Sequence, residues 1–113
     1  MRREGPIARI GPSNVDEAQL RAALDEASVA AVQNRYAPSD DADEPAEAVL
    51  APTAAHGIAF VPHGPLGANP MEPGAAADPA LALATLLARA PNVLPIPGTT
   101  KAAHLEANMA AAT

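Results

Sequence analysis

The sequence predicts an α/β fold in which short parallel strands alternate with helices. Short apolar runs that suit strands recur along the chain, at residues 7–10, 29–33, 58–61 and 93–96. Segments whose apolar residues have helical spacing follow each run, at residues 16–27, 46–55, 80–90 and 100–111. Glycine and proline mark the ends of most of these segments. Because helices separate the strands, we expect a parallel sheet with right-handed crossovers.

The first strand and helix are bounded by turn and capping residues. Gly11-Pro12 ends the strand at 7–10. Apolar side chains then recur at helical spacing through residues 16–27. Asn14 or Asp16 is the expected N-cap, because short polar side chains accept hydrogen bonds from the first turn.

The second strand, at 29–33, leads into an acidic loop at 37–45. The helix expected at 46–55 contains Pro52, which removes a backbone donor and is expected to break or kink it. His56-Gly57 is a helix stop, because glycine tolerates the left-handed conformation that often follows a last turn.

The third strand, at 58–61, ends in a Pro- and Gly-rich turn, and residues 68–79 are expected to be irregular. Four leucines form the expected core-facing side of the helix at 80–90: Leu81, Leu83, Leu86 and Leu87. The strand at 93–96 and the helix at 100–111 complete the order. The apolar runs do not alternate, so we expect both faces of the sheet to be covered.

Polar residues follow each predicted strand. They are Ser13-Asn14, Gln33-Asn34, His63 and Gly98-Thr99. In parallel α/β folds ligands bind where strands end, at the carboxyl edge. We therefore expect these residues to share one site.

Composition bounds the class of protein. The 113 residues suit one domain, and the net charge of −6 argues against a nucleic-acid partner. The chain has no cysteine, which excludes disulfides and thiolate metal sites, and its 3 histidines lack metal-ligand spacing, so we predict no metal. No apolar run has the roughly 18 residues of a membrane span, and residues 1–6 do not resemble a secretory signal. We therefore expect a cytoplasmic protein without a membrane partner.

The segment at 93–101 predicts a phosphate-binding turn. A short apolar run ends in Pro-Gly, and two hydroxyls and Lys101 then open an Ala-rich helical segment. The first turn of a helix has backbone N–H groups without internal partners and carries the positive end of the dipole. Such a turn suits a phosphate group.

Taken together, the strand ends resemble the aldo-keto reductase family, in its bacterial branch. The matching pieces are IGPSN at 10–14, VQNRY at 32–36, HGIAFVP at 56–62, PLG at 65–67, LPIPGT at 94–99 and HLEAN at 104–108. The resemblance implies an eight-stranded (β/α) barrel that binds NADP(H) or NAD(H). It covers only the carboxyl-terminal half of that barrel, so we expect 1–113 to form a single partial domain.

The resemblance also implies roles for individual residues. Ser13, Asn14 and Gln33 would hold the nicotinamide carboxamide, and His63 lies where the family usually has a ring that stacks on the nicotinamide. Gly64, Leu66 and Gly67 would follow the pyrophosphate. The residues implied at the 2′-phosphate and adenine are Gly98, Thr99, Thr100, Lys101, His104 and Asn108.

Two departures affect the implied cofactor preference. Gly98 replaces a lysine, and His104 an arginine, that many members place on the 2′-phosphate. Without these charges the NADP preference is expected to weaken, because charge-assisted contacts are the strong ones. Lys101 is expected to compensate in part.

The resemblance implies NAD(P)H-dependent carbonyl reduction in intact members, but their catalytic Asp, Tyr, Lys and His have no counterpart in this chain. We therefore predict no catalytic residue and no reduction by this chain alone. Three alternatives remain at this stage: a non-catalytic dinucleotide-binding module, a half-barrel interaction module and a decayed gene product. The expected partners are a dinucleotide, and either a second copy or a complementary front-half chain, because a half-barrel has open strand edges.

Overall fold

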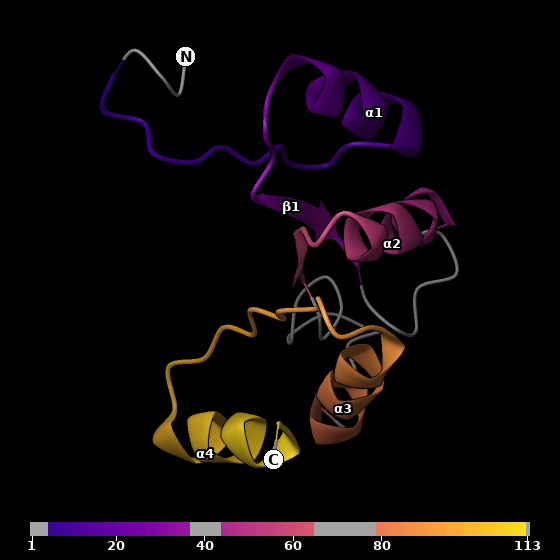
Figure 1. Ribbon diagram of the computed structural model, residues 1–113. Helices are drawn as coiled ribbons and strands as arrows, with labels where there is room; N and C mark the ends of the chain where they lie inside the picture. The colour runs from indigo at the N-terminus through magenta and orange to yellow at the C-terminus, as the bar shows by residue number, and fades with distance from the viewer. Residues whose placement is uncertain (1–4, 37–43, 65–78, 113) are drawn as a thin grey trace.

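The computed structural model describes residues 5–36, 44–64 and 79–112, which form a small α/β arrangement (Figure 1). Its elements, in order, are α1 (Glu17–Glu26), β1 (Ala31–Arg35), α2 (Glu44–Ala55), β2 (Ala59–His63), α3 (Pro79–Arg89) and α4 (Ala102–Ala111). Most of the predicted acidic loop and almost all of the segment predicted to be irregular lie outside the described residues. Among the described residues, no helix has both the length and the apolar character that crossing a membrane requires.

The sheet is parallel, as predicted, with β1 paired to β2 so that Gln33 is level with Val61. The chain before α1 joins β1 at parallel bridges, Ile10 with Val29 and Ser13 with Gln33, and Phe60 bridges to Val93 on the far side of β2. The four segments thus lie side by side in chain order. The predicted strands at 7–10 and 93–96 are reduced to single bridge positions. Each lies at an edge, and Pro12 in the first segment and Pro62 in β2 have no N–H to continue the respective ladder.

Burial alternates along both strands, which corrects the prediction that both faces are covered. Val32, Asn34, Phe60 and Pro62 are buried, whereas Gln33 and Arg35 are exposed. Among the described residues, helices therefore cover one face only. Figure 1 shows α1, α2 and α3 following one another around that side of the strands. Some positions on the uncovered face also carry apolar side chains, such as Val61. The sequence of the strands therefore lacks the alternation of apolar and polar residues that would have indicated one covered face.

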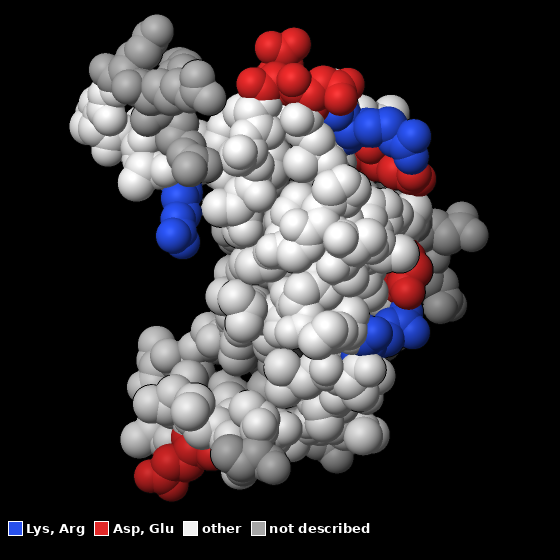
Figure 2. All heavy atoms as spheres, viewed as in Figure 1, with Lys and Arg blue, Asp and Glu red and all other residues white. Residues whose placement is uncertain are grey.

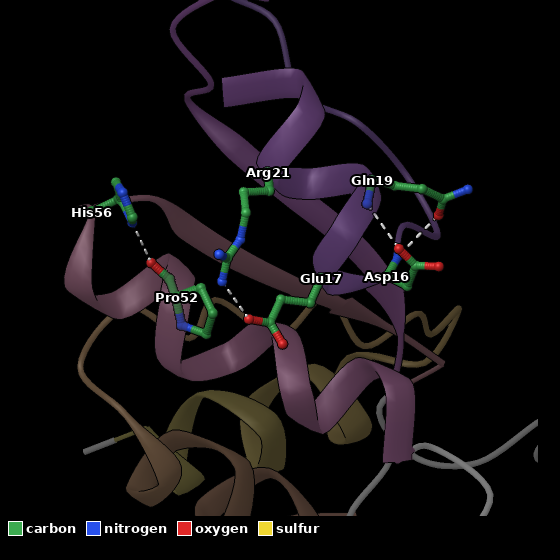
Figure 3. Close-up of polar contacts among 6 residues, drawn as sticks. All are labelled: Asp16, Glu17, Gln19, Arg21, Pro52 and His56. Carbon is green, nitrogen blue, oxygen red and sulfur yellow. Dashed lines mark hydrogen bonds and ion pairs between the residues drawn. The ribbon is translucent and has the colours of Figure 1, made fainter. Parts of the chain in front are cut away.

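α1 begins at a complete capping box. The Gln19 backbone N–H donates to Asp16 Oδ1 at 2.8 Å, and the Asp16 N–H donates to Gln19 Oε1 at 2.9 Å (Figure 3). Each bond satisfies a donor that the helix start leaves unpaired. Of the two predicted caps, Asp16 is therefore correct, and Asn14 has a different role.

α2 runs through Pro52 without interruption to Ala55, so of the predicted break or kink the break is wrong. The proline lies in the last turn of the helix, where it removes a single helical hydrogen bond. His56 Nδ1 lies 2.8 Å from the Pro52 carbonyl (Figure 3). Gly57 then ends the helix at φ 66°, as predicted, in a conformation that favours glycine.

The core lies between the covered face of the sheet and the first three helices. Its largest fully buried apolar side chains include Leu20 from α1, Val49 from α2, Leu86 from α3 and Phe60 from β2. Leu83 of α3 is also buried, but Leu81 is 63 % exposed, which corrects its placement in the core. α4 packs beside α3 and buries none of its residues.

A buried tyrosine links three elements of the covered side. The Tyr36 hydroxyl donates to Glu47 of α2 and accepts from Arg89 of α3, at 2.7 Å from Nη2, and Arg89 forms an ion pair with Glu47 at 2.6 Å. The ring of Tyr36 packs edge-to-face on Phe60, with centroids 6.0 Å apart. Burial raises the pKa of Tyr36, and the bond to Glu47 adds to that effect. Burial alone would raise the pKa of Glu47, but bonds from Tyr36 and Arg89 outweigh it and lower this pKa.

The lowered pKa of Glu47 predicts a loss of stability in acid. A carboxylate whose pKa is lower in the folded state stabilises that state above its ordinary pKa of 4.5, and this contribution is lost as the pH falls through the folded pKa. Glu47→Gln cannot titrate. Its free energy of unfolding should therefore fall less than that of the wild type between about pH 7 and about pH 3 in urea titrations. An identical fall in both proteins would contradict this role of Glu47.

Gly11 lies directly against the backbone of β1. A Cβ atom at this position would lie 2.4 Å from the Ala31 carbonyl oxygen, well inside van der Waals contact. The obstacle is backbone, so it cannot be relieved by a rotamer change. The predicted turn residue therefore also sets the distance between the first segment and the sheet.

We predict that Gly11→Ala destabilises the protein by about 1–3 kcal/mol, because the backbone of the first segment must shift. Gly5→Ala is the matched control, since nothing lies within 4 Å of its added Cβ, and it should change stability by less than about 0.5 kcal/mol. Urea denaturation followed by circular dichroism measures both. Equal effects of the two substitutions would refute the close approach.

Candidate functional site

Four of the predicted site residues meet at the carboxyl ends of the strands. Ser13 lies beside β1, and its hydroxyl donates to the Gln33 carbonyl at 2.9 Å. His63, the last residue of β2, lies 3.0 Å by its Nε2 from Asn14 Oδ1. The parallel register aligns the ends of β1 and β2, which places Arg35 level with His63. The predicted convergence is therefore present for Ser13, Asn14, Gln33 and His63, which we call the strand-end cluster.

Asn14 is the centre of this cluster. Its backbone is left-handed, with φ 53°, and its N–H donates to the Gln33 carbonyl at 3.0 Å. Its Oδ1 accepts the Arg35 backbone N–H at 3.1 Å. Because that partner is an obligate donor, the atom facing it is the amide oxygen. His63 Nε2 contacts the same oxygen and therefore carries a hydrogen.

Asn34 holds the loop that carries Ser13 and Asn14. It is buried, and its side chain makes two bonds to Val15, accepting from the N–H at 3.0 Å and donating to the carbonyl at 2.8 Å. The sequence grouped Asn34 with the residues expected to share the ligand site, whereas the structure buries its side chain against Val15. Asn34 lies on the covered face of β1, where water cannot reach its amide. Both polar atoms of a buried amide need partners in the protein, and Val15 supplies them.

The cluster leaves a defined set of polar atoms for a ligand. Ser13 has donated its hydrogen, so its oxygen can accept a hydrogen bond. Both oxygen lone pairs of Asn14 are occupied, so its Nδ2 is left as a donor. Gln33 has an exposed side chain that offers both a donor and an acceptor. This mixed set complements a primary amide, which also presents one carbonyl oxygen and one NH₂ group.

A second group of predicted residues lies around the start of α4. The Lys101 backbone N–H donates to Thr99 Oγ1 at 3.1 Å, and this hydroxyl lies 3.3 Å from His104 Nδ1. The Lys101 carbonyl accepts from the N–H groups of His104 and Leu105. Within the described residues, the N–H groups of Ala102 and Ala103 have no hydrogen-bond partner. The first turn therefore presents free donors, as predicted for an anion site.

The remaining predicted residues are not joined to either group by a described polar contact. Gly64 follows His63 with φ 63°. Gly98 and Thr100 are exposed beside α4, and Asn108 lies one helical turn beyond His104. Leu66 and Gly67 lie outside the described residues. No hydrogen bond or ion pair between described residues connects the α4 group with the strand-end cluster.

A hollow of about 290 Å³ lies elsewhere, between α1 and α2. Leu20, Leu24 and Pro52 contribute apolar lining, and Glu17 and Arg21, which line it too, form an ion pair at 2.8 Å (Figure 3). This hollow lies on the face of the sheet that the helices cover. Figure 2 shows charged side chains gathered over α1. We therefore take the strand-end cluster as the candidate site.

Comparison with known proteins identifies the family. The model of the aldo/keto reductase family matches residues 1–78. The chain belongs to the aldo/keto reductase family. This aldo/keto reductase chain is 40 % identical over 121 residues to pyridoxine 4-dehydrogenase of Escherichia coli K12, and 35 % identical over 123 residues to an uncharacterized oxidoreductase of Schizosaccharomyces pombe. These alignments cover 98 % and 99 % of the chain but only 41 % and 39 % of the relatives, so it spans about two fifths of their length.

Asn14 gives a test of the geometry of this aldo/keto reductase site. Asn14→Gly keeps access to positive φ but removes the bonds to Arg35 and His63, and should cost about 1–2 kcal/mol. Asn14→Ala also strains the backbone and should cost about 1 kcal/mol more. Urea denaturation of both variants measures the difference. Equal losses would show that the left-handed backbone does not matter here.

Proposed function

We propose that this chain provides the dinucleotide-binding part of an NAD(P)H-dependent oxidoreductase of the aldo/keto reductase family. The observation that carries the proposal is the strand-end cluster, whose available atoms complement a primary amide such as the nicotinamide carboxamide. In this arrangement Asn14 Nδ2 donates to the carboxamide oxygen, and Ser13 Oγ accepts from its NH₂ group. Gln33 completes the set through its exposed amide.

In this proposal the residues of this chain bind the dinucleotide and orient its nicotinamide ring. A bound nicotinamide supplies hydride transfer to a carbonyl carbon or from an alcohol. The hydrogen bond between His63 and Asn14 fixes one edge of the imidazole beside the amide site. We propose that the four parallel segments correspond to half of the eight-stranded barrel of the family, whose ligands bind at the carboxyl ends of strands.

The start of α4 is proposed to bind the phosphate end of the dinucleotide. Its free N–H groups and Lys101 attract an anion, and Thr99, Thr100, His104 and Asn108 surround the same turn or the turn beyond it. Gly98 contributes no charge there. We therefore propose weak discrimination between NADP(H) and NAD(H).

Tyr36 is unsuited to donate a proton to a substrate. The chain has a single tyrosine, and its hydroxyl is engaged by Glu47 and Arg89 beneath the helices. We therefore propose that the 113 residues alone reduce no carbonyl compound, and that reaction in a whole protein needs residues from the part of the relatives that this chain does not span. NADPH oxidation with 4-nitrobenzaldehyde should not exceed the rate in buffer.

The name of the Escherichia coli relative suggests a substrate class for a whole protein. It is named for dehydrogenation of pyridoxine. Oxidation of an alcohol to a carbonyl compound is the reverse of carbonyl reduction, so both directions use the same dinucleotide. We propose an alcohol and its carbonyl counterpart as the substrate pair.

Isothermal titration calorimetry with NADPH and NADH tests the proposed site. A Cβ at Gly98 meets nothing within 4 Å, so Gly98→Lys is sterically free to add the missing charge. We expect it to tighten NADPH binding about tenfold, which corresponds to about 1.4 kcal/mol, and to leave NADH binding unchanged.

Gly5→Lys is the matched control for this titration. It adds the same charge at an equally open position, so it should change neither affinity. If the wild type and both variants give no heat with either dinucleotide, the proposed function is wrong. If Gly98→Lys tightens NADH as much as NADPH, the assignment of the 2′-phosphate to α4 is wrong.

A further inference from the structure

His63 stands at the carboxyl end of β2, on the uncovered face of the sheet. The register pairs it with Arg35 and pairs Val61 with Gln33. Side chains of paired residues lie on the same face of a sheet, and both Gln33 and Arg35 are exposed. His63 is half-buried, whereas its neighbour Pro62 is buried on the covered face. The imidazole therefore shares a face with the exposed amide of Gln33.

One nitrogen of the His63 ring is held, and the other is available for a proton. Nε2 lies 3.0 Å from Asn14 Oδ1, the oxygen that also accepts the Arg35 N–H, so Nε2 carries the hydrogen. A neutral imidazole has a single N–H, so Nδ1 is the nitrogen that takes up a further proton. Among the described residues, this Nδ1 has no hydrogen-bond partner. Protonation therefore adds a positive charge and leaves the bond to Asn14 in place.

The amide of Asn14 connects this imidazole to the proposed ligand by a short path. Its Oδ1 accepts from His63, and its Nδ2 is the donor that remains for the oxygen of a ligand carboxamide. Two hydrogen bonds of about 3 Å and one amide group place that carboxamide within ~8 Å of the imidazole. The Debye length at physiological ionic strength is also about 8 Å, so a charge on the imidazole acts on the ligand.

The other charged groups near His63 keep their charge as the imidazole titrates. Arg35 of β1 is cationic at every pH at which the protein is folded. The chain before α1 brings the uncharged Asn14 against the ring. On the covered face Glu47 and Arg89 pair with each other. Within the described part of the chain no carboxylate forms an ion pair with His63, so its proton adds a charge to this face without a described partner.

We infer that His63 makes this site discriminate between the two oxidation states of the dinucleotide, because its protonated ring repels the oxidised nicotinamide and not the reduced one. The inference rests on the proposed function. The oxidised nicotinamide ring carries one positive charge, which it loses when it accepts a hydride, while the rest of the dinucleotide is unchanged. Two positive charges at this separation repel each other, whereas the reduced ring is uncharged.

The discrimination depends on pH, because histidine ordinarily changes charge between about pH 5 and pH 8. Below this range the oxidised form binds less tightly than the reduced form, and above it the difference from this source disappears. By linkage, binding of the oxidised form expels a proton from His63. In carbonyl reduction the oxidised dinucleotide is the product, so acid favours its release.

Calorimetric titration of the unmodified chain with NAD⁺ and with NADH tests the inference at about pH 6 and about pH 8.5, on either side of neutrality. The ratio of the Kd for NAD⁺ to the Kd for NADH should be about two- to threefold higher at the lower pH. The diphosphate and the adenine are common to both forms. Titration of His104 beside the phosphate end therefore cancels in this ratio.

The proton count is a second readout of the same titration. Repeating it near neutral pH in buffers of different ionisation enthalpy gives the number of protons released on binding. NAD⁺ should release a larger fraction of a proton than NADH does. An equal count for the two forms would overturn the inference.

His63→Gln separates the charge from the hydrogen bond. Glutamine retains an N–H donor for Asn14 Oδ1 but cannot titrate, so the ratio of the two Kd values should be the same at both pH values. His56→Gln is the matched control. It removes an exposed imidazole at the end of α2, where Nδ1 contacts the Pro52 carbonyl, and it should keep the pH dependence of the wild type.

The outcomes distinguish this inference from the proposed function. If both dinucleotides bind with a ratio that does not change with pH, His63 does not discriminate between them, and the proposed function stands. A pH-dependent ratio that persists in His63→Gln would also overturn the inference, because another group would then carry it. If the wild type gives no heat with either dinucleotide at either pH, the proposed function is wrong, and this inference is wrong with it.

Discussion

The parallel ladder between β1 and β2 is the constraint on which the rest of the molecule depends. It aligns the carboxyl ends of the strands, so that Arg35 and His63 reach the same level and both bond to Asn14. It also separates one buried face, where Phe60 meets Tyr36, from one open face. Without this register the strand-end cluster would not exist.

The sequence predicts much of this fold because local signals and tertiary packing agree. Asp16 caps α1 and Gly57 ends α2 through backbone chemistry that acts within a few residues. The errors arise where packing decides. Pro52 is tolerated because it lies in the last turn of α2, and Leu81 is exposed because the packing of α3, which helical spacing alone does not determine, buries Leu83 and Leu86 instead.

The candidate site is predictable by position but not by bonding. The rule that ligands bind at strand ends singled out Ser13, Asn14, Gln33 and His63 correctly as neighbours. The side-chain bonds of Asn14 and Asn34 had no local signal, since both residues bond to partners about 20 residues away or more. The left-handed backbone of Asn14 had only a weak one, because Asn adopts positive φ more readily than other residues except Gly. The contacts of Tyr36 with Glu47 and Arg89 were missed for the same reason.

The segment beside β2, residues 93–97, has a consequence for aggregation. Its Leu94 N–H donates to Phe60 of β2, and on the outward side Pro95 and Pro97 have no N–H while the Val93 N–H donates to the Ala90 carbonyl. An exposed sheet edge ordinarily adds strands from any chain, including another copy of the same edge, and so nucleates fibrils. An edge that presents only carbonyl groups cannot pair with its own kind, since neither strand has a hydrogen to give. Pro95 and Pro97 therefore make strand addition directional, and this protects an alanine-rich, sparsely aromatic chain against indiscriminate stacking.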